Sequence, residues 1–525
     1  MGALLVIATL LSTICFLIYL ISIKKFNYWK NKNVPHVKPW PIFGNYANYL
    51  LLKEYPGQLL QKLCLKFPGQ PYFGAYYGTE PTLIVHSPEI IKDVFTKDYY
   101  YFNGREISNY VKCEVMTQNL FFSSGDRWKV MRQSLTPLFS SAKMKAMFYL
   151  LEKCNHCLED LLDLETSMSN VIEIRGLSAR YTMDCICSCA FGIEANAMGS
   201  DKNNVFKVMA GQIFEASNWR GFKMVFRFIW PKIFYGLGFQ FFPPTIDAFF
   251  SKLLKGVFES RNFQPSPRND FVDLVLVLKK EQNLIGDSMS NLKSEKGTKV
   301  TIPVDDDLLV AQCIMFFAAG FDTSSATISY TLYELAKNQK AQVKAQQEVD
   351  EFLRRHKNKL NYECVNELPY LDACLYEALR LYPLFGILTR EVMEDYEFST
   401  GLRVDKGVRV HIPIYHMHYN PDFFPEPQKY KPERFLAENK QNIKQYTFFP
   451  YGEGPRICIG KRFARMQVLS GLITILKKYK VELADGMPKT LKFDPRTLLT
   501  QPSGHGIDLK FTVREGWEDR KLVRV

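Results

Sequence analysis

The stretch that most limits the fold of this chain runs from Phe448 to Gly460, near the C-terminal end. Its glycines and prolines are too dense for a helix or a central strand, so the stretch is predicted to be a shaped loop. A helix is predicted from Lys461, because apolar residues then recur at three- and four-residue spacing. Cys458 would stand just before this helix, where free backbone N–H groups and the helix dipole favour a thiolate. Arg456 and Arg462 add positive charge nearby, so the loop is predicted to present a sulfur anion.

Two glycine-rich nucleotide motifs do not fit this loop. A dinucleotide-binding loop that starts at Gly452 requires glycine at Ile457. A phosphate-binding loop that ends at Gly460 requires glycine at Pro455 and a hydroxyl residue at Arg462. An inert buried cysteine is the remaining alternative, and the glycine and proline setting favours a reactive cysteine over it.

The run Tyr451-x-x-Gly454-x-Arg456-x-Cys458-x-Gly460 resembles the haem-ligand loop of the cytochrome P-450 superfamily. These proteins are haem-thiolate monooxygenases. The resemblance implies that Cys458 is the axial metal ligand of haem b, and that the other four residues shape the cofactor-binding loop. The family usually has phenylalanine where this chain has Tyr451. A hydroxyl at that place would need a hydrogen-bond partner and would change the surroundings of the sulfur, and with them the iron potential.

A second pair of residues, Trp128 and Arg132, is four positions apart and therefore on one helix face. Taken alone, the pair indicates only a surface cation stacked on a ring, worth ~1 kcal/mol. The family has Trp-x-x-x-Arg at this place, and there both side chains bind a haem propionate. Arg390 matches a second propionate partner. Arginine suits a buried carboxylate because its fork donates two aligned hydrogen bonds.

The longest predicted helix runs from about residue 305 to 338, and its middle contains Ala319, Gly320, Asp322 and Thr323. Glycine costs ~1 kcal/mol against alanine in a helix, and hydroxyls bond back to the backbone, so a tolerated irregularity is the simpler interpretation. The segment also resembles the family's oxygen-binding helix. That resemblance implies that Ala319 and Gly320 leave room for dioxygen, while Asp322 and Thr323 relay protons.

Glu377 and Arg380 form an i,i+3 pair between apolar flanks, which favours burial over the usual solvated ion pair. Arg434, in Pro-Glu-Arg-Phe, matches the third member of the family's structural network. His416 and His418 are too few for a metal site without a third ligand, so they are interpreted as structural.

The resemblance also implies a substrate pocket above the haem. Residues 206–250 are rich in aromatic rings, and prolines and glycines are predicted to break them into pieces that lie largely in loops near a membrane. Residues 283–300 are polar and predict an exposed loop. The residues predicted to line the pocket are Phe121, Phe122, Phe316, Phe317, Phe321, Leu384, Phe385, Ile387, Leu388 and Leu499.

Residues 2–23 contain no charged side chain and would span roughly 33 Å as a helix, enough for a bilayer. A cleaved signal peptide is disfavoured, because no basic segment precedes the run and no small-residue cleavage motif follows it. The lysines that follow place the rest of the chain in the cytoplasm. The net charge of +13 is spread along the chain without the pattern of a nucleic-acid module, so no nucleic-acid partner is expected; it suits an anionic membrane and an acidic protein partner.

The expected architecture is therefore mainly α with a small β-rich subdomain, the cytochrome P-450 fold, preceded by a single transmembrane helix. The expected parts are an anchor at 1–23, a basic proline-rich linker at 24–45 and the haem-thiolate monooxygenase domain at 46–525. The expected location is the endoplasmic reticulum membrane, with the catalytic domain in the cytoplasm. The twelve cysteines are scattered through the chain and do not predict disulfides.

The resemblance implies insertion of one oxygen atom: R-H, O2, two electrons and two protons give R-OH and water. The Cys458 thiolate would donate electron density to the iron. Electrons would come from NADPH through NADPH-cytochrome P-450 reductase, with cytochrome b5 as a second possible partner. The flanking sequence is most like microsomal insect enzymes that detoxify xenobiotics, so the expected substrates are lipophilic plant allelochemicals or insecticides.

Three alternatives stay open at this point. The first is a monooxygenase of endogenous hormone or lipid biosynthesis. The second is a haem-dependent isomerase or peroxide-consuming enzyme, against which Asp322 and Thr323 argue because neither needs a proton relay to dioxygen. The third is a haem-binding sensor or carrier, for which an aromatic pocket and an oxygen-binding helix are superfluous.

Overall fold

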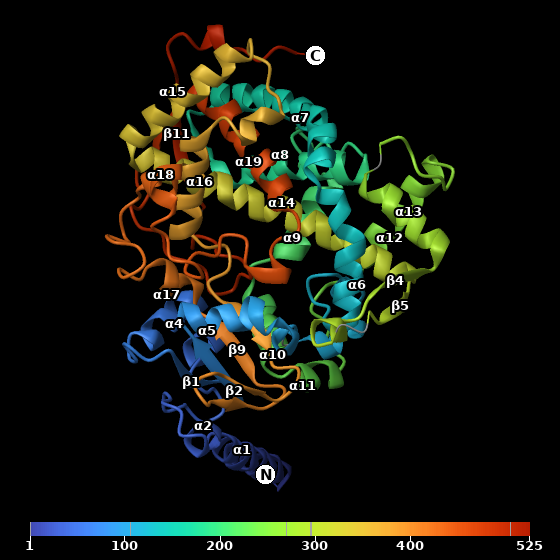
Figure 1. The fold of residues 1–525 in the computed structure, drawn as a ribbon, viewed down its shortest axis with the longest axis vertical. Coiled ribbons are helices and arrows are strands. Elements are labelled where there is room, and N and C mark those ends of the chain that lie inside the picture. The colour runs from blue at the N-terminus through green and yellow to red at the C-terminus, as the bar shows by residue number, and fades with distance from the viewer. Residues whose placement is uncertain (1, 106, 269, 295–296, 505, 525) are drawn as a thin grey trace.

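The computed structural model describes residues 2–105, 107–268, 270–294, 297–504 and 506–524. The predicted anchor begins at residue 1 and the predicted catalytic domain ends at residue 525, and these two residues lie outside the described ranges. Most of the body is helical (Figure 1). The helices are α1 (Gly2–Lys25), α2 (Tyr28–Asn31), α3 (Ala47–Leu50), α4 (Pro56–Cys64), α5 (Pro88–Lys92), α6 (Gly125–Leu135), α7 (Ser141–Met168), α8 (Ile174–Ile186), α9 (Val205–Phe214), α10 (Asn218–Ile229), α11 (Pro231–Gly236), α12 (Pro244–Ser260), α13 (Phe271–Glu281), α14 (Asp306–Lys337), α15 (Gln339–Arg355), α16 (Pro369–Leu381), α17 (Ile414–His418), α18 (Ala437–Lys440) and α19 (Lys461–Leu476).

Small sheets complete the fold, as the predicted fold class requires. One sheet has the strand order β1-β2-β9-β6 and another the order β10-β11-β3, while β4 pairs with β5 and β7 with β8. Strands β1 and β2 are antiparallel, with Tyr72 opposite Val85. The strands are β1 (Tyr72–Tyr77), β2 (Glu80–Val85), β3 (Val171–Glu173), β4 (Asn283–Asp287), β5 (Lys299–Pro303), β6 (Leu388–Glu391), β7 (Tyr396–Glu397), β8 (Arg403–Val404), β9 (Arg409–Ile412), β10 (Tyr479–Leu483) and β11 (Asp508–Val513).

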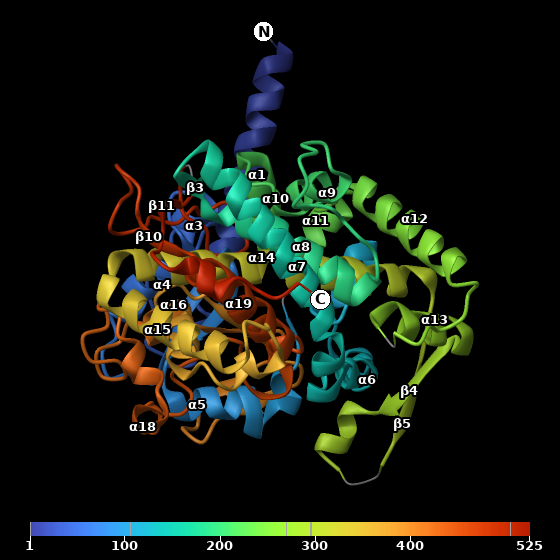
Figure 2. The ribbon, with the colours of Figure 1, turned by 90° about the horizontal axis from the view of Figure 1, so that it is seen from above.

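Helix α14 forms the centre of the body, and its predicted limits are correct to within a residue. In the part of the chain that the structure describes, it is the one helix whose length and hydropathy suffice to cross a membrane. However, 78% of its most apolar window is buried inside the protein. Helix α14 is therefore the core helix on which the other helices pack (Figure 2).

The N-terminal segment has two parts with different surroundings. Helix α1 extends away from the body in both views (Figures 1 and 2), and it exposes apolar side chains such as Leu5 and Phe16. The segment after it is packed against the β1-β2 sheet, because Trp29 is fully buried and its Nε1 donates to the Ala75 carbonyl at 2.9 Å. A Cβ atom on Gly74 would lie 2.3 Å from the Trp29 ring. Trp29, which belongs to the predicted linker at 24–45, therefore packs against the folded body.

Two predictions of loops were wrong. Residues 206–250 lie mostly in helices α9 to α12. Phe222, Phe226 and Trp230 follow one another at four-residue spacing, and Pro231 and Pro244 stand at the first position of a helix, which proline starts rather than breaks. The segment 283–300 contributes to a hairpin in which Asn283 of β4 pairs with Pro303 of β5.

Candidate active site

A cavity of about 330 Å³ lies between α14 and the loop that carries Cys458. The loop after Pro383, the segment before α6 and part of α10 complete its wall. Elements from distant parts of the chain therefore converge on one sulfur atom.

The loop holds Cys458 through its own backbone. The Cys458 N–H donates to the Tyr451 carbonyl at 2.8 Å, and the Gly460 N–H donates to the sulfur. Gly454 has a φ of +70°, and a Cβ atom there would lie 2.0 Å from the Phe95 carbonyl oxygen, so glycine is required. The Cys458 side chain is accessible to water-sized molecules, but it opens into the cavity and is otherwise enclosed by protein.

Burial raises the pKa of the Cys458 thiol above its usual value. The Gly460 N–H, Arg132 and Lys461 act in the opposite direction, as a loop at a helix start predicts, but burial outweighs them. The predicted preference for a free thiolate is therefore wrong for the loop alone. A cation bound at the sulfur would supply the missing stabilisation of the anion.

Arg456 lines the cavity, but its hydrogen bonds go to backbone carbonyls and not to the Cys458 sulfur. Its guanidinium donates to the carbonyls of Asn103 at 2.7 Å and Ser123 at 2.5 Å. Its Cζ also lies 4.7 Å from the centre of the Trp128 ring. Arg456 thus links the cysteine loop to the segment before α6 by hydrogen bonds, and it stacks against the Trp128 ring.

Trp128 and Arg132, both on α6 as predicted, line the cavity together with Arg390 of β6. Among the described residues, neither the Trp128 Nε1 nor the Arg132 guanidinium has a hydrogen-bond partner, although Trp128 is only 5% exposed. Arg390 is buried, with its Cζ 4.6 Å from the centre of the Phe95 ring. The Trp128 and Arg132 donors, which lack internal acceptors, suit the carboxylates of a bound group. Arg390 differs, because its Nη1 donates to the Thr389 carbonyl at 2.8 Å.

The four predicted residues of α14 divide between two faces of the helix. Ala319 and Thr323 line the cavity. Gly320 does not line it: a Cβ atom there would lie 2.6 Å from Ile186 of α8, so this glycine makes room for a helix and not for dioxygen. Asp322 is buried on the same side, where Arg175 donates to its Oδ1 at 2.8 Å. Two of the four residues thus contact the site and two hold α8.

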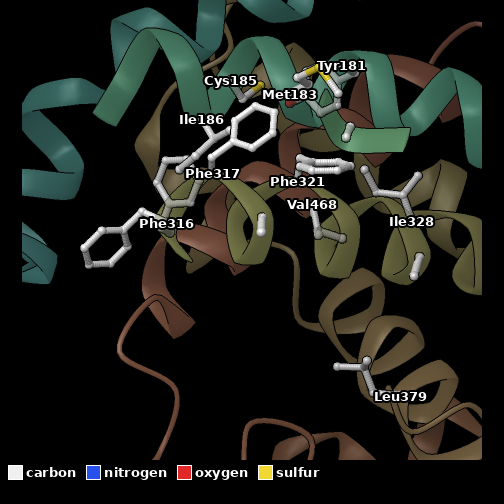
Figure 3. Packing of buried hydrophobic residues seen from close by; sticks show 14 of the residues in the cluster. Tyr181, Met183, Cys185, Ile186, Phe316, Phe317, Phe321, Ile328, Leu379 and Val468 are labelled. Atoms are coloured by element: carbon white, nitrogen blue, oxygen red, sulfur yellow. The ribbon is translucent and has the colours of Figure 1, made fainter. Parts of the chain in front are cut away.

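The structure also corrects part of the predicted pocket wall. Phe317 and Phe321 point toward α8, whereas Leu379 and Val468, which line the cavity, lie on the other side of α14 (Figure 3). Phe316 packs against Phe271, with ring centres 4.5 Å apart. These three phenylalanines of α14 face away from the cavity, and Ile387 does not line it either; the predicted residues that do line it are Phe121, Phe122, Leu384, Phe385, Leu388 and Leu499.

Several lining residues were missed. They come from α9, α10 and the segment before α12, which composition marked as aromatic without indicating which rings turn inward. These residues are Ile213, Phe214, Met224, Phe241 and Phe242.

The residues Glu377, Arg380 and Arg434 meet in one network, in which Glu377 and Arg380 are fully buried and the Arg434 side chain is 13% exposed. The Arg380 Nε donates to Glu377 Oε2 at 2.8 Å, and Arg434 Nε lies 3.4 Å from Glu377 Oε1. His418 extends this network to the cysteine loop, because its Nε2 accepts the Phe449 N–H at 3.0 Å. Its other ring nitrogen bonds the Arg380 carbonyl at 3.2 Å. His418 was predicted to be structural, but its link to the cysteine loop was not foreseen.

Tyr451 lines the cavity, and its ring lies 6.2 Å from that of Tyr376 and 5.4 Å from the Lys461 Nζ. Within the described residues, its hydroxyl has no hydrogen-bond partner. Burial raises the pKa of this hydroxyl well above the usual value, so the side chain is neutral.

The fold and the site together define a class of protein: a mainly helical body in which a cysteine faces a largely apolar cavity that Trp128, Arg132 and Arg390 also line. The family model for cytochrome P-450 matches residues 34–509, and the chain belongs to this family. The family implies a haem with a cysteine thiolate ligand, and Cys458 with its donors Trp128, Arg132 and Arg390 fits that group. The protein is thus a monooxygenase, and the family also implies a redox partner and a small-molecule substrate.

The more specific likeness is to insect enzymes. The chain is 35% identical to cytochrome P-450 6k1 of Blattella germanica, over 96% of each chain. It is 32% identical to cytochrome P-450 6B7 of Helicoverpa armigera, over 96% of this chain and 98% of the relative. It is also 32% identical to the probable cytochrome P-450 6a14 of Drosophila melanogaster, over 95% and 98%. The monooxygenase is therefore of the insect 6-series type.

Proposed function

We propose that this monooxygenase oxidises lipophilic small molecules, among them plant allelochemicals or insecticides. The observation that carries the proposal is the apolar wall of the cavity that faces Cys458. Phe121 and Phe385 lie in it with ring centres 6.2 Å apart, beside Leu384 and Leu499. A wall of this kind binds apolar molecules through burial, at about 25 cal/mol per Å² of apolar area removed from water.

Each residue of the site then has a task. Cys458 holds the iron, while Trp128, Arg132 and Arg390 orient the haem through its carboxylates. Ala319 would leave room for dioxygen in the cavity, and the Thr323 hydroxyl would supply a proton there. The haem, when bound, supplies the oxidation itself.

Electrons would come from NADPH through NADPH-cytochrome P-450 reductase, with cytochrome b5 as a second donor. Four basic residues are candidates for the docking face, and all four have partners within the chain: Arg462 Nη1 donates to the Phe139 carbonyl at 3.3 Å. Arg465 pairs with Asp372 at 2.9 Å, Lys129 donates to the Ser288 carbonyl at 2.8 Å, and Lys461 lies over Tyr451. Arg462 is exposed, and it is the residue of the four that best suits contact with an acidic partner.

The proposed location is the endoplasmic reticulum membrane, with α1 as a single-pass anchor and the catalytic body in the cytoplasm. The exposed apolar side chains of α1 support this proposal. Helices α10 and α11 lie at the same end of the molecule as α1 (Figures 1 and 2), and they carry exposed apolar residues such as Trp219 and Ile233. This end would face the lipid and receive substrates from it.

Product analysis tests the proposed substrate class. The full-length protein would be combined with the reductase, NADPH and a panel of terpenoids, furanocoumarins, pyrethroids and steroids, and mass spectrometry would detect products with one added oxygen. Turnover of the plant compounds or pyrethroids is expected. Turnover of steroids alone would contradict the proposal and favour endogenous biosynthesis.

The Cys458→Ala variant serves as the blank in this assay. It should form no oxygenated product and should lack the far red-shifted Soret band of a carbon-monoxide-bound haem thiolate. Survival of that band would contradict the role of Cys458.

A further inference from the structure

Three side chains from distant segments meet outside the haem site. Cys64 ends α4, His86 follows β2, and His416 lies in α17. One ligand atom from each lies within 4.8 Å of those from the other two. Helices α4 and α17 pack side by side next to the β1-β2 sheet (Figure 1). The three residues are far apart in the sequence, so no motif predicts that they meet. From the sequence, His416 and His418 lacked a third ligand for a metal.

The polar atoms of this cluster lack other partners. The His86 Nε2 is buried without a hydrogen-bond partner, while the Gln70 carbonyl accepts a hydrogen bond from the ring. The ring therefore bonds Gln70 through its other nitrogen, which leaves the lone pair at Nε2 without a partner. His416 is 8% exposed, and among the described residues no group bonds its ring nitrogens. Cys64 is 1% exposed and forms no disulfide. Buried polar groups without partners commonly mark a missing ligand or ion.

The protonation of the cluster suits a metal ion. Burial lowers the pKa of His86, and burial together with His86 lowers the pKa of His416 to about 4, so both rings are neutral near pH 7. Neutral imidazole is the form that binds metals. Burial raises the pKa of the Cys64 thiol, so it keeps its proton until a cation arrives.

We propose that Cys64, His86 and His416 bind a late first-row transition metal, with Zn²⁺ as the ion of first choice. One thiolate and two imidazoles are ligands that zinc prefers, whereas magnesium and calcium prefer oxygen. Water takes the fourth position. Binding replaces the Cys64 S–H bond by an S–Zn bond and releases one proton to solvent. Zn–S and Zn–N bonds of ~2.3 and ~2.1 Å place tetrahedral ligands ~3.5 Å apart, so the ligands close by about 1 Å on binding.

Such an ion joins the small sheet to the helical body. It also acts close to the haem, because His418, which accepts the Phe449 N–H of the cysteine loop, lies two residues after His416 on α17. An ion bound to His416 therefore restrains α17, the helix whose His418 accepts a hydrogen bond from the haem-ligand loop.

Metal retention on the full-length, haem-containing protein tests the proposal without any substrate. Protein in detergent, kept reduced by a phosphine, would be treated with EDTA, loaded with Zn²⁺ and passed over a weak chelating resin. Inductively coupled plasma mass spectrometry then gives zinc per haem. We expect about one zinc per haem in the parent protein, and at least a tenfold weaker retention in Cys64→Ser and His416→Gln.

Matched controls separate this site from loose surface binding. Cys364→Ser changes another fully buried free cysteine, and His36→Gln changes a histidine outside the cluster; both should keep the zinc. The carbon-monoxide spectrum of each variant shows whether the haem-binding fold persists, and the milder His86→Gln replaces Cys64→Ser if it does not. X-ray absorption at the zinc edge should give one sulfur and two imidazole nitrogens. Absence of retained zinc, equal retention in Cys64→Ser, or a zinc shell without sulfur would each overturn the proposal.

Discussion

The hydroxyl of Thr323 points along its own helix in this structure. Its Oγ1 donates to the Ala319 carbonyl at 2.7 Å, an i to i−4 bond that bends and slightly weakens a helix. To pass a proton into the cavity, this hydroxyl must turn away from the carbonyl. While this bond persists, the hydroxyl proton is not available to the cavity. A rotation of the Thr323 side chain to another rotamer would release it.

Replacement of this hydroxyl should separate electron use from product formation. In Thr323→Ala we expect a several-fold rise in hydrogen peroxide or water formed per NADPH, with little change in haem content, because proton supply fails while the fold persists. Thr323→Ser should restore coupling. The measurement is the ratio of product to NADPH consumed.

Thr331→Ala is the matched control for Thr323. Thr331 makes the same kind of bond, to the Thr327 carbonyl at 2.8 Å, but does not line the cavity. Its loss should leave the ratio unchanged. Equal uncoupling in both variants would mean that helix geometry, and not a proton relay, is at work.

His418 predicts an acid limit of stability. Its pKa is lowered from 6.5 to about 3 by burial and by Arg380. Between these values the unfolded chain binds a proton that the folded chain excludes, so stability is lost as the pH falls below 6.5. The loss is ~1.4 kcal/mol per pH unit, or about 2 kcal/mol at pH 5.

The test is the thermal midpoint of the haem-bound protein at pH 7 and pH 5. The midpoint should fall with pH in the parent protein and fall less in His418→Gln, which keeps a donor and an acceptor but cannot titrate. Parallel slopes in the two proteins would rule out His418 as the cause.

At the scale of elements, one face of α14 lines the cavity and another packs against α8. Ala319 faces the cavity, and the neighbouring Gly320 packs against Ile186 of α8. The Arg175–Asp322 ion pair reinforces this second face. The family motif in the middle of α14 therefore combines a reaction surface with a packing surface.

Two adjacent substitutions should reveal this division. Ala319→Val fills the cavity, so we expect slower binding of carbon monoxide with little change in thermal midpoint. Gly320→Val should do the reverse, because overpacking against Ile186 costs typically 1–3 kcal/mol.

A second substitution, Ile186→Ala, should restore part of the stability that Gly320→Val loses, because the smaller side chain at position 186 leaves room for the valine. If Gly320→Val instead slows carbon monoxide binding while stability is unchanged, then Gly320 faces the haem side after all.

At the scale of the whole molecule, the chain changes its surroundings between α1 and Trp29. Helix α1 exposes apolar side chains, whereas Trp29 is buried against Gly74 and Ala75. The boundary between an attached and a soluble form should therefore lie before Trp29, and not at the end of the proline-rich segment.

One deletion and one substitution test this boundary. Deletion of residues 2–23 should weaken membrane attachment in a fractionation assay and preserve haem content. Trp29→Ala in the full chain should keep the attachment but lower stability by ~3–5 kcal/mol, measured as a lower thermal midpoint. Loss of haem from the soluble, folded 2–23 deletion would contradict a separate anchor.

Much of the architecture could be predicted from local pattern. The limits of α14 and α19 follow from helical periodicity, and the β1-β2 pair from a run of strand-forming residues. The loops predicted at 206–250 and 283–300 were wrong because proline and glycine were interpreted as breaks. In the structure, proline starts helices there and Gly286 lets β4 approach Val130 of α6.

The sequence alone determined which chemistry this chain carries, because the motif around Cys458 and the Trp128–Arg132 pair are local, and their resemblance to the family can be recognised without a fold. Only the tertiary structure decided which side chains share a space. Phe317 and Phe321 point toward α8 (Figure 3), whereas Thr323 lines the cavity, and composition does not show which face of the helix each residue takes. Cys64, His86 and His416 meet only because α4, β2 and α17 pack together, and contacts between such distant segments have no signature in a single sequence.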